Sequence, residues 1–294
     1  MAGKQVTELD ALPSFTDNSL LPVHNGAGLK KGLLSQLANY LGTKFNNPNL
    51  LINPDFKINQ RGATSYEQQG YSVDRWKIWN VTVTPSTSGG ITVKNDKYTD
   101  TGTFLQYLEN ATEGDSTLSC YVTSVSGTVT MVADDNSQVI LKQGLNVVHT
   151  SKSTKTFTIF LNRGTSITLK WVKLEQGKVA TSFIAPNPAE ELEKCLRFSR
   201  YIPTIYCVPL RRYIGDISNA RAYYLPLGCV FETKLRAKGT ISLKGGVFDS
   251  TSSSLGGIKE IDYSQDEIRQ VIMPQEMTPW TLILKKVFID AEIY

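Results

Sequence analysis

The chain has 294 residues, of which 40% are hydrophobic and 20% charged, a composition typical of a folded protein. Its 31 Lys and Arg against 27 Asp and Glu give a net charge of +4, too small a bias to indicate binding to nucleic acid or to a membrane surface. The sequence has no apolar run long enough to span a membrane and no apolar secretory segment near its first residue. Its length predicts about two globular units.

Cysteine and histidine are too sparse for the common metal and catalytic arrangements. The widely spaced cysteines fit neither a zinc site nor a redox pair, so we expect buried thiols. They are Cys120, Cys195, Cys207 and Cys229. The two histidines, His24 and His149, lie far apart, which argues against a histidine metal site or a Ser-His-Asp triad unless one of them is the base. Composition therefore predicts a protein that is not an enzyme and has no cofactor or metal.

Residues 1–46 are expected to form a short adaptor with one helix. Leucines spaced three to four residues apart predict two to three helical turns that end before Gly42. These leucines are Leu33, Leu34, Leu37 and Leu41. The preceding residues alternate short apolar runs with turn formers and predict extended chain and turns. Because so short a helix is not stable alone in water, we expect this segment to pack against partner chains.

Residues 47–187 are predicted to be almost wholly β. Eight short runs rich in β-branched and aromatic residues are separated by Gly, Asp and Asn turns, the pattern of a β-sandwich or jelly roll. The runs are 81–84, 91–93, 104–108, 118–122, 128–132, 139–141, 156–161 and 166–172. Their strand order cannot be read from the pattern.

Residues 188–294 are predicted to begin with a short helix and to continue as a β-rich domain. Asn187 is a suitable N-cap, Pro188 suits the first helical position, and Glu190 could complete a capping box. The expected apolar stripe consists of Leu192, Cys195 and Leu196. The expected strands are 205–210, 222–225, 229–233, 240–243, 280–284 and 287–293, with a polar loop over 249–257.

Three ordered blocks of sequence resemble bacteriophage tail-fibre and receptor-binding proteins. The first is NLLINPDF at 49–56, followed by QRG and then YSVDRW at 71–76. The second is LSCYV at 118–122 with SGTV after it, and the third is WVKLEQG at 171–177, followed by ATSF and EELEKC. The final FIDAE at 288–292 and the opening segments TEL and LLPV add a weaker likeness.

The resemblance implies a homotrimeric virion protein, made in the bacterial cytoplasm, with a jelly-roll domain like a carbohydrate-binding module. Its expected partners are itself, tail, collar or baseplate proteins through residues 1–46, and a bacterial surface glycan or envelope receptor. Nucleic-acid binding and membrane insertion are not expected. A purely structural fibre, collar or baseplate connector is an alternative. A polysaccharide depolymerase is a weaker one, because the long repeats typical of such enzymes are absent from the sequence.

Two groups of residues are candidates for glycan or receptor binding. In the first, Tyr71, Trp76 and Trp79 could stack on a sugar ring, although core burial is the favoured alternative for such aromatic residues. The second group combines residue types that are common in recognition hot spots, and a trimer interface explains it equally well. It consists of Arg211, Arg212, Tyr213, Tyr223 and Tyr224, with Arg221 nearby.

Two polar motifs have structural explanations that we favour over ligand binding. Asp55, Gln60 and Arg61 could hold a loop end or a cation, but a hydrogen-bonded network is the better expectation because buried polar groups need partners. Asp134, Asp135 and Asn136 could offer oxygens to calcium, but they match no EF-hand loop and are typical of a β-turn.

Overall fold

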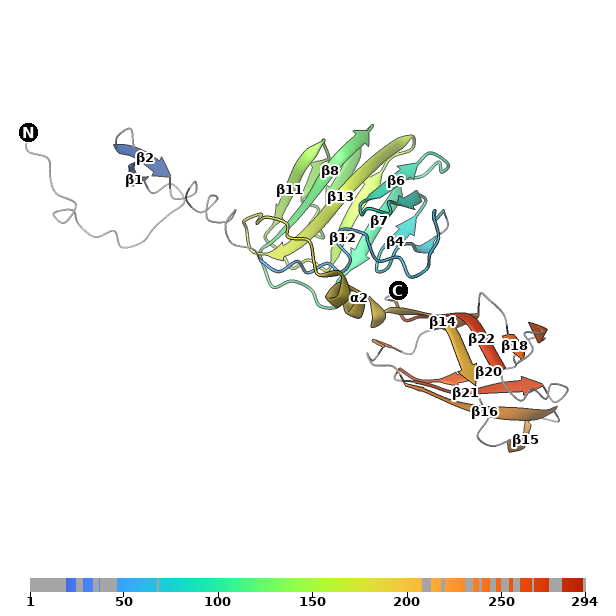
Figure 1. The fold of residues 1–294 in the computed structure, drawn as a ribbon. Coiled ribbons are helices and arrows are strands. Elements are labelled where there is room, and N and C mark those ends of the chain that lie inside the picture. The colour runs from blue at the N-terminus through green and yellow to red at the C-terminus, as the bar shows by residue number, and fades with distance from the viewer. Residues whose placement is uncertain are drawn as a thin grey trace, which may run out of the picture.

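The computed structural model describes residues 20–24, 29–33, 37, 47–67, 69–207, 213–217, 220–230, 235–237, 240–243, 247–249, 254–255, 260–265, 267–274 and 282–292. The described chain is mainly β, as predicted, and its sheets are antiparallel. A short hairpin comes first, a two-layered sandwich follows, and the helix α2 leads into a second group of strands (Figure 1).

The first hairpin corrects part of the N-terminal prediction. Strand β1 (Leu20–His24) pairs with β2 (Leu29–Leu33), so Leu33 is extended rather than helical. The sequence between them contains Asn-Gly, a strong hairpin turn signal that outweighs the leucine spacing there. Leu37 is helical as predicted, whereas Leu34 and Leu41 lie outside the described residues.

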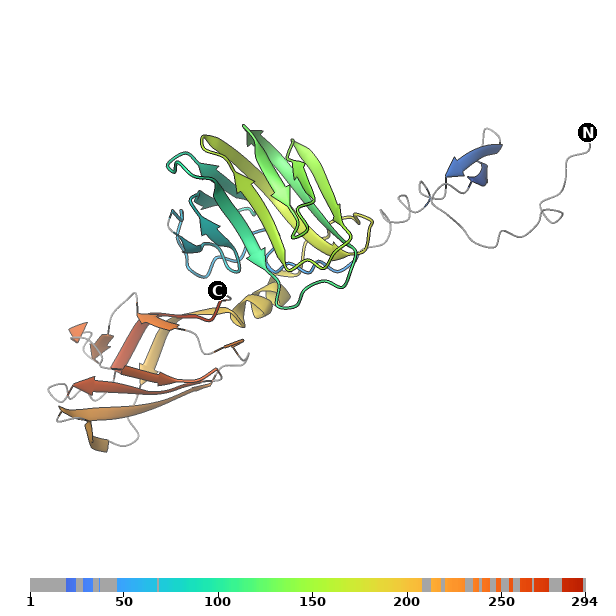
Figure 2. The same cartoon turned by 180° about the vertical axis from the view of Figure 1, so that it is seen from behind.

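Two antiparallel sheets stack face to face to form the sandwich (Figures 1 and 2). The six-stranded sheet has the order β10-β9-β12-β7-β4-β3, and the five-stranded sheet has the order β11-β8-β13-β6-β5. The strand bounds are β3 Gly70–Tyr71, β4 Lys77–Trp79, β5 Thr82–Pro85, β6 Ile91–Asn95, β7 Gly102–Tyr107, β8 Ser116–Ser126, β9 Val129–Val132, β10 Gln138–Ile140, β11 Gly144–Thr150, β12 Thr156–Leu161 and β13 Thr165–Gln176.

Each of the eight predicted runs overlaps one of these strands, whereas β3, β4 and β11 were not predicted. Strand β11 lacks the usual apolar alternation of a strand, because two of its buried residues, Asn146 and Thr150, are polar. The Asn146 side chain is satisfied locally, since its amide donates to the carbonyls of Lys142 and Gly144 and its oxygen accepts from the Lys142 amide. Local hydrogen bonds thus allow a polar side chain to occupy a core-facing position.

The sandwich core is built around Trp76, as the favoured interpretation predicted. Its side chain is fully buried, stacks on Phe104 at 4.7 Å between ring centroids, and meets Phe157 edge-on at 5.9 Å. Phe56 packs at 5.1 Å on the same indole, whose Nε1 donates to the Asn53 carbonyl at 2.9 Å. Trp76 is therefore a core residue and offers no face to a ligand from solvent.

The helix α2 (Pro188–Leu196) starts where the sequence predicts, but its buried face differs from the expected stripe. The Asn187 side chain accepts from the Ala189 amide at 2.9 Å, which confirms the N-cap. Leu192 is 37% exposed, and the buried residues of the helix are Glu191 and Cys195. The leucine prediction is wrong because the helix packs through a carboxylate: Glu191 accepts the Asn53 amide of the sandwich.

Two further sheets follow the helix. One has the order β14-β22-β18-β19, with β17 also paired to β22, and the other has the order β15-β16-β21-β20. Their strands are β14 Ser199–Cys207, β15 Tyr213–Ile217, β16 Ala220–Val230, β17 Thr240–Leu243, β18 Val247–Asp249, β19 Ser254–Leu255, β20 Glu260–Tyr263, β21 Glu267–Pro274 and β22 Leu282–Asp290.

Several predictions for this region need correction. The predicted strands 222–225 and 229–233 belong to one strand, β16, as far as they are described, and its register shifts between Pro226 and Cys229; residues 231–233 lie outside the described residues. Of the strands predicted at 280–284 and 287–293, residues 282–284 and 287–290 belong to one strand, β22, and Lys286 within it has a positive φ of 52°. The predicted polar loop 249–257 contains β19, while β15, β18, β20 and β21 were not predicted. A local irregularity interrupts β16 and another interrupts β22, so the sequence of each resembles two short strands.

Cys120 and Cys195 are buried, as expected, and their thiols should be inert in the folded protein. Burial raises the pKa of Cys120 to about 12 and also raises that of Cys195. Because the thiolate is the reactive form, we expect neither thiol to be alkylated by iodoacetamide at neutral pH until urea unfolds the chain. Peptide mass spectrometry would resolve the two sites, and labelling of either in the folded protein would contradict the expectation.

Candidate functional site

Residues of the QRG, YSVDRW and FIDAE blocks meet at the junction between the sandwich and the strands after α2. Arg75 of the YSVDRW block and Glu292 of the FIDAE block form an ion pair at 2.6 Å, 217 positions apart in the sequence. Their side chains are 1% and 0% exposed. The Glu292 carboxylate also accepts the Arg75 backbone amide at 3.0 Å. We call this ion pair and its neighbours the junction network.

Gln60, Arg61 and Asp74 extend the junction network. Asp74 accepts hydrogen bonds from the Gln60 amide and side chain, both at 2.7 Å, and from the Ser199 hydroxyl at 2.8 Å. Arg61 pairs with Asp290 at 3.0 Å. The structural interpretation of Gln60 and Arg61 is therefore confirmed. Asp55, the third residue of that motif, pairs with Lys57 at 2.7 Å.

The buried charges of the junction network shift one another's pKa values. Burial raises the pKa of Glu292, against the opposing pull of Arg75 and Arg61. Burial likewise raises the pKa of Asp74, while Arg61 and the hydrogen bonds from Gln60 and Ser199 oppose it. For Arg61, burial disfavours the charge, but Asp290, Glu292 and Asp74 outweigh it and raise the pKa of the guanidinium. The cations thus offset only part of the cost of burying Glu292 and Asp74, whose pKa values stay raised.

Unlike Trp76, Trp79 faces solvent. Within β4 the burial alternates, so Ile78 points into the core while Lys77 and Trp79 point outward. Trp79 is 49% exposed on the outer face of the six-stranded sheet. It therefore remains available for ligand stacking.

Strand register places Trp79 in a straight row across five neighbouring strands. Trp79 lies opposite Thr103, which lies opposite Phe160; Phe160 lies opposite Thr130, and Thr130 opposite Ile140. Directly opposed residues share one face of an antiparallel sheet. We call these five residues the aromatic row. Exposed apolar side chains alternate along it with threonines.

The aromatic row is open to a ligand. Phe160 is 37% exposed and Ile140 is 57% exposed, and the two threonines are partly exposed. Trp79 and Phe160 stand two strands apart, about 10 Å at the usual strand spacing. Aromatic faces can pack on the C–H faces of sugar rings, and the intervening hydroxyls can exchange hydrogen bonds with sugar hydroxyls. The row consists of apolar side chains and hydroxyls and has no carboxylate.

Sequence reasoning missed Phe160, although a signal was present. Phe157, Ile159 and Leu161 alternate along the same strand and are all buried, so the intervening Phe160 must point outward. What the sequence did not contain was the register that aligns Phe160 with Trp79.

Tyr71, the third residue of the first candidate group, is not in the aromatic row. It lies opposite Lys77 at the β3 edge of the sheet and is partly buried. Its ring centroid is 5.6 Å from the Arg61 guanidinium carbon, and it lines a separate pocket at the junction. The sequence group of Tyr71, Trp76 and Trp79 is thus divided among an edge, the core and an outer face.

Of the second candidate group, the structure describes only the backbone of the tyrosines. Tyr213 on β15 lies opposite Tyr224 on β16, and Tyr223 lies opposite Ile214. Arg211 and Arg212 lie outside the described residues.

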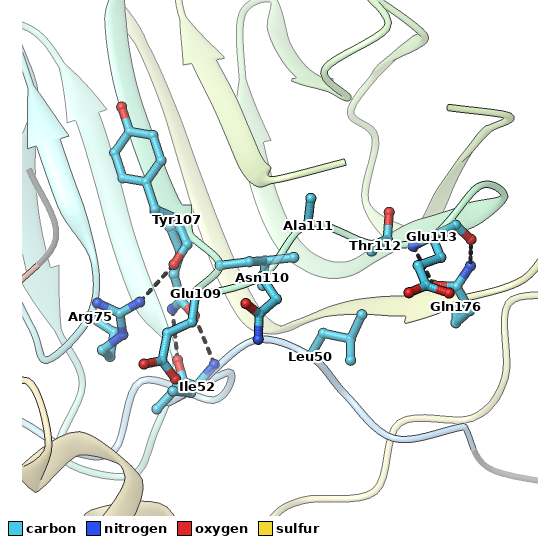
Figure 3. A pocket seen from close by; sticks show the side chains of 12 residues that line it. Leu50, Ile52, Arg75, Tyr107, Glu109, Asn110, Ala111, Thr112, Glu113 and Gln176 are labelled. Atoms are coloured by element: carbon cyan, nitrogen blue, oxygen red, sulfur yellow. Dashed lines mark hydrogen bonds between the residues drawn. The ribbon is translucent and has the colours of Figure 1, made fainter. Parts of the chain in front are cut away.

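A pocket of about 550 Å³ lies at one end of the sandwich (Figure 3). In it the Arg75 guanidinium donates to the Tyr107 carbonyl at 2.6 Å, and the Gln106 amide donates to the Ile52 carbonyl at 2.7 Å. The Gln176 side chain accepts the Glu113 amide at 3.2 Å. These bonds attach neighbouring segments to β7 and the loop after it, which is a structural role.

The remaining motifs are also structural. Asn136 donates to the Ala133 carbonyl at 2.9 Å with φ of 68°, which confirms the predicted turn at 134–136. In the WVKLEQG block, Lys173 and Glu175 form a buried ion pair at 3.1 Å, and Trp171 stacks on Phe183 of the ATSF block at 4.7 Å.

Neither protein-family models nor curated proteins match the chain. In the part of the chain that the structure describes, no group of three or more His, Cys, Asp or Glu side chains is placed to hold a metal ion. Within the same residues, no helix combines the length and apolar character needed to cross a membrane.

Proposed function

We propose that this chain is a bacteriophage tail-fibre or receptor-binding protein that attaches the virion to a bacterial surface by recognising a glycan. The observation that carries the proposal is the aromatic row, with Trp79 and Phe160 exposed on one sheet face and threonines between its apolar members. The sequence blocks that resemble phage fibre proteins supply the biological context. On this proposal the chain acts by recognition and is not an enzyme.

We further propose that the sandwich is a jelly roll. The strand pairing supports this proposal because it is nested: the first strand of the series β6–β13 pairs with the last, the second with the second-last, and so on. The pairs are β6 with β13, β7 with β12, β8 with β11 and β9 with β10. A long hairpin folded over into two sheets in this way is the jelly-roll arrangement. If the sandwich is a jelly roll like that of a carbohydrate-binding module, the aromatic row lies on the outer face of one of its two sheets.

The proposed assembly is a homotrimer in the virion. Residues 1–46 would join it to tail, collar or baseplate proteins, 47–187 would form the jelly roll, and 188–294 would form the β-rich tip. A trimer would carry three glycan-binding sites. Once one site has bound, the second and third bind intramolecularly, so the trimer would hold the surface more tightly than one weak site could.

Binding of the fluorescently labelled protein to bacterial cells tests the proposal. We expect binding to be lost after periodate oxidation of surface sugars. Trp79→Ala and Phe160→Ala should each weaken it by about 2 kcal/mol, roughly thirtyfold, if these residues are the contact hot spots. Tyr121→Ala is the matched control, since Tyr121 is 39% exposed on the other sheet.

Binding that resists periodate, or that both row variants retain, would refute glycan recognition by the aromatic row. Absence of binding by the folded protein to every strain tested would favour the connector function instead. Size measurement by light scattering would test the trimer separately.

A further inference from the structure

A second pocket lies where the sandwich meets the strands after α2. It encloses about 510 Å³, within the range of small-molecule sites. One wall comes from residues 61–71 at the β3 edge of the sandwich, and the other comes from β17 and β22. Its lining is Arg61, Ala63, Ser65, Tyr66, Glu67, Gln69, Tyr71, Thr240, Ser242, Phe288 and Asp290. We call it the junction pocket.

The charges of the junction pocket are compensated within the protein. Arg61, whose side chain is 8% exposed, pairs with Asp290 at 3.0 Å. Glu67 pairs with Lys97 at 2.6 Å. An ionic ligand would therefore have to compete with partners that are already in place. The pocket favours a neutral ligand.

The neutral groups of the pocket combine hydrogen-bonding side chains with aromatic rings. Ser65, Gln69, Thr240 and Ser242 are exposed and contribute three hydroxyls and an amide. Ser242 has a long contact of 3.4 Å to the Phe288 carbonyl, which leaves its oxygen able to accept another hydrogen bond.

Two tyrosine rings add apolar surface to this lining. Tyr66 and Tyr71 are partly exposed and line the sandwich side of the pocket. The Tyr66 hydroxyl is held by Asn59 and by the Ala63 amide, so its ring has a fixed position. Fixed rings beside several donors and acceptors suit a ligand that carries many hydroxyls on a ring with C–H faces.

We propose that the junction pocket binds a neutral pyranose residue, as a site separate from the aromatic row. The inference rests on the proposed function only in taking the natural ligand to be a surface glycan, since the pocket is defined by its own lining. Both walls are needed, because the rings come from the sandwich and two of the hydroxyls come from β17. The junction network holds these two walls together, so sugar binding in the pocket also requires the junction network.

Saturation-transfer difference NMR with free sugars tests the junction pocket without cells. The probes are the methyl glycosides of glucose, galactose and N-acetylglucosamine, with glucuronate as the charged comparison. We expect saturation transfer to at least one neutral glycoside and at least tenfold weaker binding by Gln69→Ala and Ser242→Val. Both substitutions are at exposed positions, so thermal unfolding should be unchanged.

Trp79→Ala separates the two sites. If the junction pocket binds sugar, this variant should retain the NMR signal even where it loses cell binding, so either proposal can fail alone. No transfer to any of the three neutral glycosides would overturn the inference. So would a signal that survives Gln69→Ala/Ser242→Val when both are introduced into the Trp79→Ala variant, where binding by the aromatic row is weakened. A stronger signal from glucuronate would also overturn it.

Discussion

Replacing Glu292 by alanine is expected to lower the free energy of unfolding by about 3–5 kcal/mol, because it leaves the buried charge of Arg75 without its partner. The Arg75 guanidinium carbon lies 3.6 Å from the centroid of the Phe198 ring, and one of its nitrogens donates to the Tyr107 carbonyl. Neither contact supplies a negative charge. The variant also leaves the Arg75 backbone amide without its acceptor.

Urea unfolding followed by circular dichroism measures this loss. Arg75→Ala and the Arg75→Ala/Glu292→Ala double variant complete a double-mutant cycle. The double variant should lose less free energy of unfolding than the sum of the losses in the two single variants. Glu67→Ala is the control, since it breaks the exposed Lys97–Glu67 pair and should leave stability unchanged. A loss below about 1 kcal/mol for Glu292→Ala would place the pair in solvent rather than in a buried junction.

The second large effect is expected from Trp76→Ala, which should destabilise the sandwich by about 3–5 kcal/mol. The substitution removes a fully buried indole from among Phe56, Phe104 and Phe157, and leaves a cavity that their rings can fill only in part. It also removes the hydrogen bond from the indole nitrogen to the Asn53 carbonyl.

Trp79→Ala is the matched control for Trp76→Ala, because it removes the same side chain from a half-exposed position three residues away. Its effect on stability should stay within about 0.5 kcal/mol. Trp76→Phe should fall between the two, since it keeps an aromatic ring but loses the hydrogen bond. Equal losses for the two alanine variants would contradict the assignment of Trp76 to the core and Trp79 to the surface.

Trp76 is buried and Trp79 is exposed, and this contrast shows what the local sequence can and cannot predict. Both lie in one aromatic segment, and the residue types alone favour core burial for either. Strand β4 starts only after Trp76, so the alternation that turns Trp79 outward does not extend back to Trp76. Trp76 is buried because the tertiary structure packs it among Phe56, Phe104 and Phe157.

The motifs behind the family resemblance illustrate the same limit. From the sequence, Gln60 and Arg61 could hold a loop end or a cation, with a hydrogen-bonded network as the favoured interpretation. The structure shows that Gln60 reaches Asp74 and the Ser199 carbonyl, and that Arg61 reaches Asp290. Partners more than 130 positions away cannot be named from spacing, because nothing local constrains them.

The class of the fold, the position of most sandwich strands and the start of α2 could all be predicted from the amino-acid sequence. These features follow from side-chain alternation, turn residues and capping, which act over a few neighbouring positions. The strand order, the register that aligns Trp79 with Phe160, and the ion pair between Arg75 and Glu292 became visible only in the folded chain. Pairing and burial are set by which surfaces can pack together and satisfy their polar groups, and that choice is made by the folded chain as a whole.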